Sequence, residues 1–81
     1  MKLPRDVSGD ELAKYLKVFG YLPTRQSGSH LRLTTTEKGE HHLSIPRHES
    51  LKVGTLAGIL SDVAEHFELS REELVARLFG D

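Results

Sequence analysis

The sequence contains no cysteine, and this absence removes several kinds of site at once. Without thiols the chain cannot form disulfides, use a cysteine nucleophile, or bind zinc or iron–sulfur clusters through sulfur. Packing alone must therefore stabilise the fold, which is demanding for a chain of 81 residues. Any catalysis has to come from histidine, carboxylate or hydroxyl side chains.

Long apolar runs are also missing, since no stretch approaches the roughly 20 residues that a membrane-spanning helix needs. The first residues, MKLPRDVSGDE, become acidic before an apolar stretch develops, which is not the pattern of a secretory signal. We therefore expect a cytoplasmic protein. With 37% apolar and 28% charged residues and no repeat or linker, residues 1–81 are expected to form a single domain.

Net charge is only −1, but the charges are unevenly distributed along the chain. Residues 14–52 hold seven Lys and Arg against three Glu, together with four of the five histidines. Residues 53–81 hold two Arg against six Asp and Glu, most of which fit the solvated faces of helices. A basic middle segment is where a polyanion would bind, and the acidic end would repel it.

Three amphipathic segments predict helices. Ser8 followed by Glu11 forms a capping box, and Gly20 can take the left-handed conformation that ends a first helix. A second capping box, Ser70 with Glu73, begins the third helix. The apolar stripes expected to face the core are Leu12, Tyr15, Leu16 and Phe19 in the first helix; Val53, Leu56, Ile59, Leu60, Val63 and Phe67 in the second, beginning near Gly54-Thr55; and Leu74, Val75, Leu78 and Phe79 in the third.

Three strands are expected between the first two helices. Residues 21–26 suit an edge strand because Pro23 cannot donate to a central ladder, and Ser27-Gly28-Ser29 then turns the chain. Residues 30–36 and 41–46 form a hairpin around a three-residue loop, Glu37 to Gly39, with Gly39 left-handed. Leu31 and Leu33 must lie on the same face as Leu43 and Ile45, and this loop achieves it by placing Leu33 opposite Leu43 and Leu31 opposite Ile45.

This register leaves a polar face on the other side of the sheet, which carries His30, Arg32, Thr34, His42 and Ser44. The fold class that follows is α+β, with helices on one face of a three-stranded antiparallel sheet. Polar residues on a solvated sheet face need no function, and we take that as the default for Arg32, Thr34 and Ser44.

His30 differs from these residues because it enters its strand directly after a turn of small residues. Gly28 and Ser29 leave its ring open to a substrate, and the amides of such a turn can face a phosphate. Imidazole titrates near neutral pH and is the usual general acid/base in a protein without thiols or a metal. His30 is therefore the candidate catalytic residue.

A metal site is the competing interpretation of the histidines. His41 and His42 are adjacent in a strand, so they point to opposite faces and cannot share an ion. His30, His42 and His48 could converge only if the loop after Pro46 folds back, and we expect no carboxylate beside them on the polar face. We therefore expect no metal and no other cofactor. His66 is expected on the surface of the second helix.

Three motifs together resemble a known family, the HicA (YcfA-like) toxins of bacterial and archaeal toxin–antitoxin pairs. The resemblance covers residues 8 to about 69. Its motifs are Arg25-Gln-Ser-Gly28-Ser29-His30-Leu-Arg-Leu, then Ile45-Pro46-Arg47-His48, then Gly54-Thr55-Leu56 with Ile59-Leu60. Two features depart from the family pattern: Glu37-Lys38-Gly39 replaces the frequent Pro-Asp-Gly turn, and the third helix, about residues 70–80, is an extension.

The resemblance implies a double-stranded-RNA-binding-domain-like fold, α-β-β-β-α, and a metal-independent ribonuclease that cleaves mRNA and is neutralised by a HicB antitoxin. The histidine of the family's Gly-x-His turn corresponds to His30, which would exchange a proton during cleavage. The residues expected to contact the RNA substrate are Gly28, Ser29, Arg32, Arg47, His48 and Lys52.

Two other functions remain open from the residues. The same fold also serves as a non-catalytic RNA-binding module that reads RNA shape and backbone without cutting it. A third interpretation is a small interaction domain whose sheet edge or hairpin docks a protein, with incidental histidines and no affinity for RNA.

Overall fold

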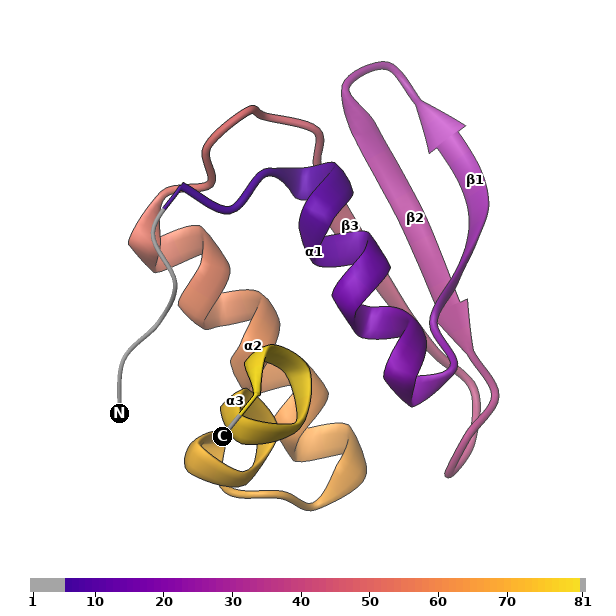
Figure 1. Ribbon diagram of the computed structural model, residues 1–81. Coiled ribbons are helices and arrows are strands. Elements are labelled where there is room, and N and C mark those ends of the chain that lie inside the picture. The colour runs from indigo at the N-terminus through magenta and orange to yellow at the C-terminus, as the bar shows by residue number, and fades with distance from the viewer. Residues whose placement is uncertain (1–5, 81) are drawn as a thin grey trace.

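The computed structural model describes residues 6–80, which form two layers: a three-stranded antiparallel sheet and a layer of helices against one of its faces (Figure 1). The elements are α1 (Gly9–Tyr15), a 3-10 helix (Leu16–Phe19), β1 (Leu22–Ser27), β2 (His30–Thr35), β3 (His41–Pro46), α2 (Val53–Phe67) and α3 (Arg71–Phe79). This order confirms the predicted α+β fold with its additional C-terminal helix. The expectation about a signal segment falls partly on residues 1–5, outside the described residues.

The register of the β2–β3 hairpin is confirmed, with Leu33 opposite Leu43 and Leu31 opposite Ile45. Leu33, Leu43 and Ile45 are buried against the helices because every second side chain of a strand points to the same face. The turn differs in detail from the prediction. Pairing stops at Thr35 and His41, and Lys38 as well as Gly39 has a positive φ, 55° and 100°.

The first helix begins as predicted and ends differently. Ser8 and Glu11 form the capping box, with the Ser8 hydroxyl accepting from the Glu11 amide at 3.0 Å. The predicted continuous helix changes into the 3-10 helix after Tyr15, which tightens the last turn before Gly20 (φ 83°). Tyr15 is 42% exposed, so this part of the predicted stripe faces outward, with its ring edge-on against Phe79 of α3.

The other two helices follow their predicted stripes with one exception. Val53 is 72% exposed because it begins α2 directly after the loop, where one turn of the helix projects beyond the core. The Ser70–Glu73 capping box of α3 is present. Leu74, Val75 and Leu78 join the same apolar core as α1, α2 and the inner face of the sheet, so α3 completes this core.

No helix within residues 6–80 is both long enough and apolar enough to cross a membrane.

Candidate functional site

The turn before His30 is as tight as the small residues suggested. Ser27 pairs with His30, so Gly28 and Ser29 alone connect β1 to β2. Gly28 takes the positive φ of 56° that a non-glycine side chain disfavours, and a Cβ there would meet open space. The amide of Arg47 donates to the Ser29 carbonyl at 2.7 Å, which ties the turn to the end of β3. His30 is exposed beside this turn.

A β-bulge at Thr24 determines which β1 side chains reach the polar face. Pro23 pairs with Leu33 and Arg25 pairs with Arg32, so Thr24 is an extra residue in β1. In an unbroken alternation from Tyr21, which is buried, Arg25 would point to the helix side of the sheet. The extra residue turns it to the opposite face, beside Arg32. Residue alternation alone does not reveal this.

These side chains line an open groove on the outer face of the sheet. Its volume is about 600 Å³, and its lining residues are Arg25, Ser27, His30, Arg32, His42, Leu43 and Ser44. The guanidinium groups of Arg25 and Arg32 make no hydrogen bond or ion pair with any other residue in the described range 6–80. The groove therefore combines an accessible imidazole with two cations available to an anion.

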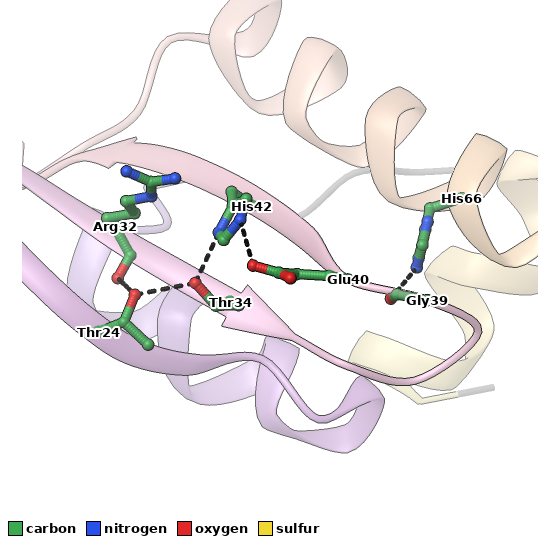
Figure 2. A network of polar contacts seen from close by, with 7 residues as sticks. All are labelled: Thr24, Arg32, Thr34, Gly39, Glu40, His42 and His66. Carbon is green, nitrogen blue, oxygen red and sulfur yellow. Dashed lines mark hydrogen bonds and ion pairs between the residues drawn. The ribbon is translucent and has the colours of Figure 1, made fainter.

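A chain of polar contacts crosses all three strands next to this groove (Figure 2). The Thr24 hydroxyl donates to the Arg32 carbonyl at 3.4 Å and lies 2.9 Å from the Thr34 hydroxyl. Thr34 Oγ1 lies 2.8 Å from His42 Nδ1, and His42 Nε2 lies 2.9 Å from Glu40 Oε2. Glu40 corrects the expectation that no carboxylate stands beside the histidines of the polar face. It is two residues before His42 on β3's side of the turn, and i, i+2 positions share a face.

Five of the six predicted substrate contacts lie outside this groove's lining. Arg47 is held by Asp10 of α1 in a two-bond contact, at 2.9 and 3.1 Å. This contact lowers the pKa of Asp10 and raises the pKa of Arg47, in both cases chiefly through the side-chain hydrogen bond. His48 and Lys52 are exposed in the following loop, and Lys52 stands at the N-cap position of α2 without a side-chain capping bond. Gly28 and Ser29 form the turn beside the groove, and Arg32 lines it.

His41 and His42 do point to opposite faces, and His41 belongs to an inner cluster. Tyr21 is fully buried, and its hydroxyl lies 2.7 Å from His41 Nδ1. The His41 ring stacks on His66 of α2 with centroids 4.5 Å apart and planes 12° apart. Burial raises the pKa of Tyr21 to about 12. Burial and then the neighbouring His66 lower the pKa of His41.

His66 corrects a second expectation, because it is half-buried rather than a surface residue. Its Nε2 donates to the carbonyls of Glu37 and Gly39, at 2.9 and 3.1 Å. Figure 2 shows the contact with Gly39. A carbonyl can only accept, so Nε2 carries the proton. His66 thus connects α2 to the β2–β3 turn. Across residues 6–80 there is no group of three or more His, Asp or Glu side chains placed to hold a metal ion.

The fold and the groove define a small α+β protein whose sheet presents imidazole and guanidinium groups on its open face. A family model described as "HicA toxin of bacterial toxin-antitoxin" matches residues 9–64, more than half of the chain. The chain belongs to the HicA toxin family, whose members are generally ribonuclease toxins of toxin–antitoxin pairs. Searches of curated proteins and of solved structures found no significant match.

Proposed function

We propose that this protein is a metal-independent ribonuclease toxin that cleaves mRNA, with His30 as its general acid/base. The observation that carries the proposal is the position of His30, exposed in a groove whose cations Arg25 and Arg32 have no partner among the described residues. Membership in a family of toxins supports it.

The chemistry needs a proton carrier and positive charge near one phosphodiester. A positioned imidazole that takes a proton from the attacking oxygen, or gives one to the leaving oxygen, accelerates cleavage by roughly 10²–10⁴. Negative charge grows on the phosphate oxygens as the bond breaks, and a guanidinium placed in advance stabilises it. Arg32 lies two residues after His30 on the same face, about 7 Å along the strand, so both can reach one backbone segment.

The remaining predicted contacts contribute to RNA binding to different extents in this proposal. Gly28 and Ser29 give the phosphate close access to His30, and the exposed His48 and Lys52 extend the positive surface beyond the groove. Arg47 contributes less, because Asp10 already balances its charge. The whole chain acts as one domain, in which α3 stabilises the core and leaves RNA binding to the sheet.

The partner we propose is a HicB-like antitoxin that covers the groove. Unpaired cations on an open sheet face fit an acidic or polar surface of a partner, because opposite charge speeds encounter and the bound partner excludes RNA.

The test compares His30→Ala with Glu49→Gln, a substitution in the exposed loop after β3. Both variants should unfold in urea near the wild-type midpoint, since exposed substitutions usually change stability by within about 0.5 kcal/mol. Cleavage of mRNA should disappear in His30→Ala alone, and wild-type cleavage should persist in saturating chelator. A folded His30→Ala protein that cuts at the wild-type rate overturns the role of His30. RNA binding without cleavage by the wild-type protein would identify a non-catalytic RNA-binding module instead.

A further inference from the structure

A second pocket adjoins the His30 groove on the same face of the sheet. Its volume is about 310 Å³, and its lining residues are Thr24, Arg25, Arg32, Thr34, Glu40 and His42. Arg25, Arg32 and His42 line both hollows, so the two lie side by side. His30 and Thr34 are four residues apart on β2, which places the second pocket about 13 Å along the strand from His30. A neighbouring nucleotide of the same RNA would lie there.

The hydrogen bonds along the polar chain determine what this pocket can offer a ligand. The Arg32 carbonyl can only accept, so the Thr24 hydroxyl donates to it, and the Thr24 and Thr34 hydroxyls share a second hydrogen bond. Nδ1 of His42 contacts the Thr34 hydroxyl, and Nε2 donates to Glu40 because an ionised carboxylate only accepts. With all four bonds formed, both hydroxyls and both ring nitrogens are committed.

Glu40 is the group left with unused capacity. Its Oε2 accepts from His42, and within residues 6–80 nothing donates to its Oε1. The carboxylate is 67% exposed at the mouth of the pocket. An ionised carboxylate only accepts hydrogen bonds, with about four lone-pair positions on two oxygens. The pocket therefore presents a pure acceptor to whatever enters it.

A phosphate does not suit this position, because Glu40 would repel it. A nucleobase does suit it, since single-stranded RNA is commonly read on the Watson–Crick edges of unstacked bases, with arginine planes against the rings. Arg25 and Arg32 form the wall that the two pockets share. Phosphate then lies toward His30, and a base lies toward Glu40.

Only one of the four bases offers two adjacent donors to a carboxylate. Guanine presents N1–H beside the 2-amino group. Adenine and cytosine place an acceptor nitrogen next to their amino group, and uracil flanks its N3–H with two carbonyl oxygens. In those three bases a lone pair would face the carboxylate, which costs binding energy because neither group can donate to the other.

We propose that the pocket formed around Glu40 and His42 binds a guanine base of the RNA, and that Glu40 is the residue that selects it. This inference rests on the proposed function, in that the guanine belongs to the RNA whose backbone lies at His30.

The experiment measures binding separately from cleavage. Fluorescence anisotropy would compare three labelled oligoadenylates that carry guanine, inosine or adenine at one central position, using the full-length His30→Ala protein. Inosine keeps N1–H and lacks the 2-amino group. Guanine should bind tighter than adenine by roughly 5- to 150-fold, the range for one bidentate side chain–base pair, with inosine between them. Adding Glu40→Gln should remove most of this preference, because an amide replaces one acceptor with a donor. The matched Glu49→Gln should retain it.

Equal affinity for the three RNAs, or an unchanged preference in Glu40→Gln, overturns the guanine assignment. Cleavage of the same RNAs by the wild-type protein, measured in parallel, tests the proposed function independently. Cleavage without a guanine preference would support the ribonuclease function and reject the guanine-binding pocket. A Glu40-dependent guanine preference without cleavage supports the pocket and rejects the ribonuclease.

Discussion

His41 and His42 are neighbours in the chain, yet they belong to two different parts of the molecule. His41 points toward the helices, where Tyr21 and His66 hold it. His42 points outward into the groove, where it contacts Thr34 and Glu40. Residue type therefore says little about the role of a histidine in this sheet. The strand alternation decides whether the ring supports the fold or faces a ligand.

The same division applies to each neighbouring pair along β2. Leu33 is fully buried, and Arg32 before it is exposed in the groove. Residues on the inner face should determine the stability of the fold, and residues on the outer face should determine RNA binding. Substitutions on adjacent residues test this division.

The largest expected effect comes from Leu33→Ala on the inner face. Removing a fully buried leucine side chain leaves a cavity and should lower the free energy of unfolding by about 2–5 kcal/mol. Arg32→Ala should change the free energy of unfolding by no more than about 0.5 kcal/mol. It should instead weaken RNA binding and reduce the slope of log affinity against log salt by less than one unit. Urea unfolding and salt-dependent RNA binding measure the two effects. A stability loss of similar size in both variants would contradict the division.

A smaller loss is expected from His66→Ala in the inner cluster. The substitution removes the stack on His41 and leaves the carbonyls of Glu37 and Gly39 without their donor. Glu37 and Gly39 are exposed, so their carbonyls can bind water instead, and the loss should be about 0.5–1.5 kcal/mol in urea unfolding. His42→Ala is the control on the outer face and should cost less. If His42→Ala proved the more damaging, the polar chain of the outer face would be the structural one.

Acid should weaken the fold through His41. Its pKa in the folded protein lies below the unfolded value, so the unfolded chain binds more protons as the pH falls. Stability is complete above about pH 6.5 and declines as the pH drops toward the folded pKa. The charges of His66 and His42 add to the lowering of this pKa, and those of Asp62 and Glu65 oppose it only partly. Urea midpoints measured between about pH 7.5 and 5 should fall for the wild type and less steeply for His41→Gln. Parallel curves would show that other groups dominate.

The smallest expected effect belongs to Arg47→Ala. Asp10 balances the Arg47 charge at an exposed site, so the substitution should weaken RNA binding less than Arg32→Ala does and lower stability only slightly. Asp10→Asn, which frees the Arg47 guanidinium, should strengthen RNA binding. The same salt titrations measure both changes. An Arg47→Ala loss equal to that of Arg32→Ala would place Arg47 among the RNA contacts.

The hairpin register was predictable because Leu31 and Leu33 must share a face with Leu43 and Ile45, and a short loop ending at Gly39 selects one such pairing. The starts of α1 and α3 were predictable because Ser–Glu capping boxes are local in sequence. Both are features that a few neighbouring residues determine.

The features that the sequence did not reveal depend on contacts between distant residues. The Arg47–Asp10 pair spans 37 positions, and the hydrogen bonds of His66 to the β2–β3 turn span 27 and 29. The bulge at Thr24 has no simple residue signature, so Arg25 could not be assigned to the groove by counting along β1. Glu40 was the exception, since its i, i+2 relation to His42 was visible in the sequence.

The bulge at Thr24 also sets how the length of this protein can vary during evolution. Deleting Thr24 alone would give a regular β1–β2 ladder, with Leu22, Pro23, Arg25, Gln26 and Ser27 still opposite their present partners. Relatives one residue shorter at this point would keep the same outward-facing side chains. A one-residue deletion within Leu31–Leu33 would not be tolerated in the same way, because it would exchange the inner and outer faces of half a strand. In an alignment of relatives, length differences in the sheet should therefore gather at Thr24 and at the two turns.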